Sequence, residues 1–276
     1  CMASTIPHEA VKAGASYLIK PLDYDSFIEL LCKAPSIKKP PRRLIEDVPI
    51  ASGCLGSCTF CITRLARPRL ISRSIDDVVD HIKRSISRGT VELHLTAQDL
   101  AAYGRDKGTD LLDLLNAILD IREQFMLRLG MMNIDTLRPL LPELFEMYND
   151  KRIYKFLHIP VQSGCEDILR KMGRRYTPHE FIEIVENFRG MFDDSMIATD
   201  VIAGFPGEDD SAFERTISLL KRTTPDIINI KGYSSRPMTK ACHWKHPPSQ
   251  VIKDRTRFLT ELHELLNKKI CSKYLG

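Results

Sequence analysis

The sequence is poor in features that would place the protein in a membrane or outside the cell. It has no apolar run long enough to cross a bilayer, and the residues given include no secretory signal. Eight cysteines in 276 residues are a modest number and argue against a disulfide-based scaffold. We therefore expect a reducing compartment, the cytoplasm, and no membrane association. The formal net charge of +4 is small and excludes little.

Three of the cysteines are close together, in the segment Cys54-Leu-Gly-Ser-Cys58-Thr-Phe-Cys61. Three convergent thiolates can hold three corners of a cubane 4Fe–4S cluster, whereas a pure electron carrier normally supplies a fourth cysteine. A structural zinc site is the alternative, but it needs four ligands. The histidines nearest in sequence, His81 and His94, fall in a predicted helix and a predicted strand. The spacing therefore predicts an iron–sulfur cluster with one open iron, which a small chelating ligand could occupy.

Beyond residue 45 the sequence alternates between short apolar strands and amphipathic helices. Repeated βα units form a parallel sheet with right-handed crossovers. Six units predict an α/β fold, an open partial (βα)6 barrel with its chemistry at the carboxyl ends of the strands. The cysteine segment follows the first strand, and so falls on that rim. Strands are predicted over 48–51, 91–96, 126–131, 154–159, 196–203 and 227–231, and helices over 75–87, 111–122, 136–148, 167–172, 178–188, 210–222 and 249–269.

The chain also divides by composition. One strand and one helix within residues 14–34 are too little for a core, and a stiff, basic, proline-rich stretch follows them. Because the chain begins at Cys1 and ends at Gly276 just after a basic helix, we expect a fragment of a longer protein. The expected divisions are the tail of an α/β N-terminal domain (1–36), a linker (37–44), the (βα)6 core (45–240) and a C-terminal helical segment (241–276).

Basic residues cluster at several places, and one cluster leads directly out of the cysteine segment. Arg64 and Arg67 belong to it and are the best candidates for contacts with RNA phosphates, because cations beside a reactive centre suit an anionic substrate. Arg174 and Arg175 are weaker candidates, since an exposed helix end explains them equally well.

Polar side chains follow three successive predicted strands. Gln98 and Asp99 follow the second strand, Asn133 follows the third, and Gln162 and Ser163 follow the fourth. Each could cap the helix that comes next. Three polar positions on one rim favour a shared ligand pocket over three independent caps.

Four further residues near this rim have open roles. Gly204 follows the fifth strand, in a turn that could let the backbone approach a ligand. Phe60 either stacks on a bound ligand or is a core aromatic. We expect His158 to be a structural histidine and Cys165 to be a small core residue, although Cys165 lies near the rim.

These motifs together resemble the radical S-adenosylmethionine (SAM) methylthiotransferases. The resemblance is closest to the archaeal and eukaryotic branch, whose substrate is threonylcarbamoyladenosine next to the anticodon of tRNA. Met238 departs from the pattern, because the family usually has glycine there. The resemblance is carried by residues 52–61, 63–67, 95–99, 103–106, 128–133, 158–164 and 199–208.

The resemblance implies three cofactors and a site. A 4Fe–4S cluster would bind Cys54, Cys58 and Cys61, and its open iron would chelate SAM. Cys1 would be the last of three cysteines that hold a second 4Fe–4S cluster, with the other two upstream of this chain. The SAM-binding residues would be Phe60, Gln98, Asn133, Gln162, Ser163 and Gly204.

The resemblance also implies a reaction. Reductive cleavage of SAM would give a 5′-deoxyadenosyl radical, which takes hydrogen from carbon 2 of the adenine before a methylthio group is installed. The implied partners are tRNA and an electron donor, with no obligate protein partner. The alternatives are a methylthiotransferase for isopentenyladenosine in tRNA or for a ribosomal protein, and an iron–sulfur RNA-binding module without turnover.

Overall fold

The computed structural model describes residues 11–12 and 43–271. The expectations for Cys1, for the N-terminal tail and for most of the linker lie outside the described residues. Six parallel strands form two three-stranded sheets, which adjoin where Leu127 bridges to Ile153 in parallel. The predicted six-strand partial barrel is confirmed. In spatial order the strands are β1 (Ile45–Pro49), β4 (Glu92–Thr96), β5 (Met126–Leu129), β6 (Phe156–His158), β7 (Met196–Ala203) and β8 (Ile227–Gly232).

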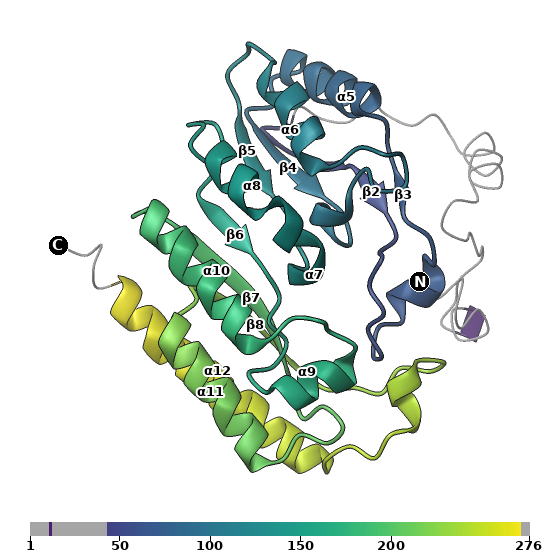
Figure 1. Ribbon diagram of the computed structural model, residues 1–276, viewed down its shortest axis with the longest axis vertical. Helices are drawn as coiled ribbons and strands as arrows, with labels where there is room; N and C mark the ends of the chain where they lie inside the picture. The colour runs from purple at the N-terminus through teal and green to yellow at the C-terminus, as the bar shows by residue number, and fades with distance from the viewer. Residues whose placement is uncertain (1–10, 13–42, 272–276) are drawn as a thin grey trace.

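Helices cover one side of this curved sheet (Figure 1). Their apolar faces pack on strand residues such as Leu93 and Leu95, both fully buried. Side chains fix where the helices begin: Ser74 accepts the Asp77 N–H, and Thr177 forms a capping box with Glu180. In the described part of the chain, no helix is long and apolar enough to span a bilayer. The covering helices are α5 (Ile75–Ser87), α6 (Leu111–Leu119), α8 (Leu141–Met147), α10 (Pro178–Met191), α11 (Asp210–Thr223) and α12 (Ser249–Cys271).

The helix expected over 136–148 is divided into three pieces, because Pro139 and Pro142 each lack a backbone N–H and interrupt the helical hydrogen bonds. The pieces are α7 (Ile134–Leu137), the 3-10 turn η2 (Arg138–Leu140) and α8. Several short elements lie outside the predicted pattern, because they are too brief to show periodicity. They are the antiparallel pair β2 (Ala51–Ser52) and β3 (Ile71–Ser72), α4 (Thr63–Ala66), η1 (Leu100–Ala102) and η3 (Lys240–His243).

The loops that matter for function gather at the carboxyl ends of the strands. We call residues 53–62 the cysteine loop and residues 233–248, between β8 and α12, the basic loop. Both lie beside the end of α9 (Glu166–Met172) (Figure 1). Backbone hydrogen bonds join all three: Thr59 N–H donates to Met172 O at 3.0 Å, and Ala241 N–H donates to Thr59 O at 3.0 Å. Segments far apart in sequence therefore form one rim.

Candidate active site

The cysteine loop begins in a conformation that only glycine adopts easily. Gly53 has φ +88°, and a Cβ atom there would lie 1.8 Å from the carbonyl oxygen of Arg69. The Gly53 N–H donates to Gln98 Oε1 at 2.6 Å. Gln98, two residues after β4, thus fixes the start of the cysteine loop.

Two of the thiols flank Gly56. A Cβ atom on Gly56 would lie 3.3 Å from Cys54 Sγ and 3.6 Å from Cys58 Sγ, so a side chain there would fill the space between the sulfurs. Burial raises the pKa of both thiols. Among the described residues no three His, Cys, Asp or Glu side chains converge on a point that would suit a single metal ion. A cubane does not need such a point, because each thiolate binds a different iron. Three cysteines in one loop, two of them on either side of a glycine, are the donor set that a cubane with one open iron requires.

Arg174 is placed differently from our expectation of an exposed helix end. Its side chain is half-buried, and its Nη1 donates to Asn133 Oδ1 at 2.9 Å. Its charge offsets part of the effect of burial at Cys54 and Cys58, although the pKa of both thiols stays raised. Its Nε atom is buried and has no protein partner. Arg174 therefore places a cation beside these two thiols, with one donor still available to a ligand.

Asp99 organises the rim behind the cysteines. It is fully buried and accepts the Asn133 N–H at 3.0 Å and the Thr136 hydroxyl at 2.8 Å. It makes no side-chain cap to η1, so the helix-cap alternative is wrong for this residue. Burial raises the pKa of Asp99, although these bonds and the charge of Arg174 act in the other direction. Asp99 thus fixes Asn133, which in turn accepts from Arg174.

A small hollow lies beside this network. Its volume is about 150 Å³, and Cys58, Asn133 and Thr136 contribute to its wall. Gly173, the left-handed residue that ends α9, closes one side with φ +80°. The other lining residues are Leu55, Gly56, Ser57, Arg105, Asp135 and Arg175.

Gln162 and Ser163 do not behave alike. Gln162 is only 7% exposed, adopts φ +66°, and carries a buried Oε1 atom without a partner. Strain and an unpaired buried acceptor together are typical of ligand-binding positions. Ser163 instead lies 3.4 Å from the Thr216 hydroxyl and accepts the Cys165 N–H at 3.2 Å. Its side chain is engaged with α11 and with its own loop.

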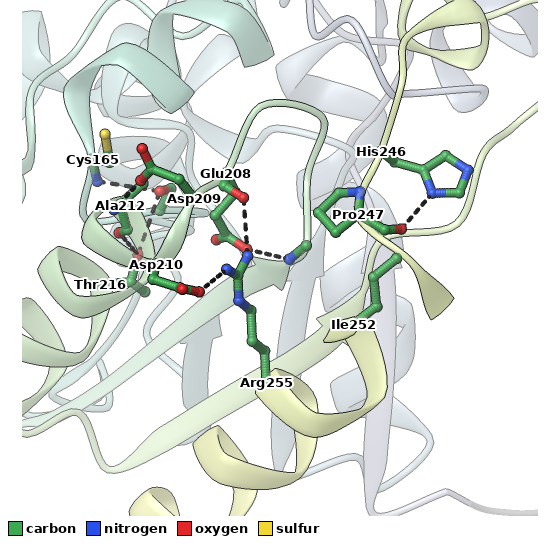
Figure 2. Close-up of polar contacts among 12 residues, drawn as sticks. Cys165, Glu208, Asp209, Asp210, Ala212, Thr216, His246, Pro247, Ile252 and Arg255 are labelled. Atoms are coloured by element: carbon green, nitrogen blue, oxygen red, sulfur yellow. Dashed lines mark hydrogen bonds and ion pairs between the residues drawn. The ribbon is translucent and has the colours of Figure 1, made fainter. Parts of the chain in front are cut away.

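Gly204 is required by packing rather than by an open approach to the rim. It has φ +74°, and a Cβ atom would lie 2.5 Å from Ile252 Cγ1 of α12. Its N–H donates to Glu208, whose carboxylate accepts from Arg255 at 2.9 Å. Arg255 also binds Asp210 at 2.6 Å (Figure 2). The turn after β7 is thereby fastened to α12.

The remaining predicted residues lie on the cysteine loop, on α4 or just after it, and in the basic loop. Phe60 is half-buried and meets the buried Phe205 edge-on, with ring centroids 6.1 Å apart. Arg64 is exposed, as a phosphate contact requires. Arg67 is half-buried, and its Nε atom has no protein partner. Met238 keeps the turn of the expected glycine by adopting φ +64°.

Sequence comparison assigns the fold and the cysteine loop to one family. The model of the radical SAM superfamily matches residues 48–220. The chain belongs to the radical SAM superfamily. Two radical SAM structures support the fold, both at low sequence identity. HemN from Escherichia coli aligns with TM-score 0.60 and 15% identity over 88% of this chain and 56% of that one. TsrM from Kitasatospora setae aligns with TM-score 0.60 and 16% identity over 72% and 36%.

More similar relatives carry a specific name. A Pyrococcus abyssi protein named "probable threonylcarbamoyladenosine tRNA methylthiotransferase" is 48% identical over 236 residues, covering 86% of this chain and 56% of that protein. The human threonylcarbamoyladenosine tRNA methylthiotransferase is 41% identical over 229 residues, covering 83% and 39%. The chain thus spans about half the length of the relatives it matches.

Proposed function

We propose that this radical SAM chain is the central part of a tRNA methylthiotransferase that acts on threonylcarbamoyladenosine and gives its 2-methylthio derivative. The observation that carries the proposal is a three-cysteine loop on a radical SAM fold, in a chain 48% identical to a relative with that name. The substrate is tRNA, the reducing equivalent comes from an electron donor, and the setting is the cytoplasm.

Each residue of the site receives a role in the proposal. Cys54, Cys58 and Cys61 would hold a 4Fe–4S cluster, and when bound it supplies the electron that cleaves SAM. Arg174 stabilises the thiolate form of the ligands and offers its free Nε to an anionic group. Asp99 holds Asn133 in place for contact with SAM in the adjoining hollow.

The other predicted residues complete the pocket at its edges. Gln98 orients the loop through Gly53, and Gln162 presents an unpaired acceptor that suits a donor group on SAM. Ser163 and Gly204 support the wall from behind, and Phe60 closes the side nearest the third cysteine. Arg64 and Arg67 would contact RNA phosphates. A second cluster, with Cys1 among its ligands, belongs to the longer protein in this proposal.

Two measurements test the proposal separately. Reduced, reconstituted protein is incubated with SAM, and 5′-deoxyadenosine is measured; formation above an apo-protein control is expected. Next, nucleosides of tRNA from a strain lacking the gene are analysed by mass spectrometry. Loss of the methylthio mark on threonylcarbamoyladenosine is expected. If the mark remains and no second copy of the gene exists, the substrate assignment is wrong; absence of SAM cleavage would favour a non-catalytic module.

A further inference from the structure

The basic loop carries the only tryptophan of the chain, in an unusually basic stretch. Residues 227–253 contain no aspartate or glutamate. Within the loop, Arg236, Lys240 and Lys245 are exposed, as is His243. A cationic loop without acidic residues is the electrostatic signature of a surface that meets a polyanion.

Trp244 lies at a hollow in this loop, with part of its ring open to solvent. Its side chain is 38% exposed, although tryptophan is usually well buried. Trp244 borders a hollow of about 300 Å³, together with Pro206, Gly207, Lys171 and Lys245. An aromatic surface in the same hollow as cationic side chains is the arrangement by which proteins stack a nucleobase and neutralise the neighbouring phosphates.

The two lysines are available for such a role. Both are exposed, and neither forms an ion pair with a carboxylate in residues 43–271. A Cβ atom on Gly207 would lie 2.4 Å from Lys171 Nζ, so the ammonium group rests over this glycine at the edge of the hollow. The hollow would lose that position if residue 207 had a side chain.

Trp244 also packs on a core aromatic residue that contacts the cysteine loop. Its ring meets the buried Phe205 edge-on, with centroids 6.1 Å apart and an interplanar angle of 84°. Phe205 in turn meets Phe60, the residue before Cys61. The loop backbone is bonded to the cysteine loop by Ala241 N–H to Thr59 O. The basic loop therefore lies on the same rim as the cysteine loop (Figure 1).

We infer that Trp244, in a hollow that Lys171 and Lys245 also line, is a stacking platform for an unpaired base of the RNA substrate. The inference rests on the proposed function for its RNA, and it adds a base-binding position to the phosphate contacts of Arg64 and Arg67. Stacking recognises the face of any base, so this position holds the anticodon loop beside the reactive centre rather than selecting its sequence.

The single tryptophan provides a direct test in the wild-type chain. A synthetic anticodon stem-loop RNA is titrated at fixed salt while tryptophan emission and binding anisotropy are recorded. Binding should quench the emission, because the base stacks on the indole ring. The same RNA with abasic loop positions, and inorganic polyphosphate, should bind without that quenching. Equal quenching by polyphosphate would reduce the site to general anion binding and overturn the stacking inference.

Variants then measure the contribution of the ring. Trp244→Ala should weaken stem-loop binding about tenfold or more, which corresponds to about 1.4 kcal/mol, and Trp244→Phe should restore most of it. The matched control is Phe258→Ala, since Phe258 is 45% exposed on α12 and also packs on a phenylalanine. Lys171→Gln and Lys245→Gln should each lower the salt dependence of binding. The slope of the logarithm of the binding constant against the logarithm of the salt concentration should become shallower by about 0.7 for every phosphate that the variant leaves without a cation.

The outcomes separate this inference from the proposed function. If the wild-type chain cleaves SAM and binds the stem-loop, but its emission is unchanged and Trp244→Ala binds as tightly, the stacking inference is wrong and the proposed function stands. If the wild-type chain binds no RNA, the stacking inference fails, and SAM cleavage and the deletion-strain analysis still decide the proposed function. Should Trp244→Ala not fold, as judged by circular dichroism, the wild-type emission and the Trp244→Phe variant still decide.

Discussion

The two halves of the sheet use the polar residues of their rim in different ways. In the half formed by β1, β4 and β5, these residues bond to one another and to the cysteine loop, as Gln98 does with Gly53. In the half formed by β6, β7 and β8, Ser163 bonds toward Thr216 of α11. A polar residue that directly follows a strand is therefore only a weak indication of ligand binding, because its side chain can form a hydrogen bond to the helix behind the rim instead.

The difference extends to charge. In the first half, the buried Asp99 has no ion-pair partner in the described residues and satisfies its oxygens with neutral donors. In the second half, Glu208 is buried against Arg255, with side chains 1% and 8% exposed. Burial raises the pKa of both carboxyl groups. The first half uses its acid to position Asn133, which the proposed function assigns to SAM, and the second uses its acid to attach α12.

The largest expected effect follows removal of one cysteine from the loop. Cys58→Ala should abolish SAM cleavage, because a cubane held by two thiolates loses one of its protein-bound corners. Iron content and the visible absorbance of the reconstituted protein should fall with it. The matched control is Cys271→Ala, since Cys271 is exposed at the end of α12; it should retain the wild-type values. Full activity of Cys58→Ala would show that this loop does not hold the cluster.

The second effect breaks the attachment of α12. Arg255→Met leaves Glu208 buried without its cation and should lower the free energy of unfolding by about 3–5 kcal/mol. Urea denaturation of the apo protein measures this. Arg222→Met, which breaks the exposed pair with Glu186, should cost at most about 1 kcal/mol. Equal costs for the two variants would remove the distinction drawn between a buried and an exposed pair.

A third comparison tests the two halves of the rim directly. Gln98→Ala leaves the Gly53 N–H without its acceptor and should weaken SAM binding about tenfold, or about 1.4 kcal/mol, as the loop loses its orientation. Ser163→Ala should leave SAM binding within about twofold and cost about 1 kcal/mol of stability. Isothermal titration with SAM and urea denaturation give the two numbers. A loss of SAM affinity greater than twofold in Ser163→Ala would show that Ser163 contributes to the SAM pocket.

The smallest effect is a pH dependence. Because burial raises the pKa of Asp99, the folded chain keeps this proton over a range above pH 3.8 where the unfolded chain has lost it. Stability of the wild type should therefore fall across that range as pH rises. Asp99→Asn should lack this decline. At pH 7 its free energy of unfolding should differ from that of the wild type by about 1 kcal/mol. Urea titrations of both proteins between pH 4 and 7 measure how the free energy of unfolding changes with pH. The same slope for the wild type and for Asp99→Asn would show that Asp99 makes no contribution.

The sequence predicted the sheet and the cysteine loop well, because both depend on local patterns. Apolar runs of strand length and three closely spaced cysteines are visible without any long-range contact. The role of Arg174 was not predictable, since it depends on Asn133, 41 residues away in sequence. Its neighbour Arg175 has a similar sequence context and remains exposed.

Trp244 carries a signal in the sequence itself. It is a lone tryptophan within a stretch of 27 residues, 227–253, that has no acidic side chain. What the sequence does not show is that Lys171, from α9, completes the same hollow. Pairings between distant segments are set by how βα units close on one another, and local patterns in a single sequence do not reveal them.

One backbone amide links the two loops of the rim. The Ala241 N–H belongs to the loop that would meet RNA, and its acceptor, the Thr59 carbonyl, lies one residue after Cys58. Any displacement of the basic loop must break this bond or move the cysteine loop as well. The hydrogen–deuterium exchange rate of the Ala241 amide should therefore change when RNA binds the basic loop and when a cluster binds the cysteine loop. A single amide would thus measure the coupling between the substrate site and the cofactor site.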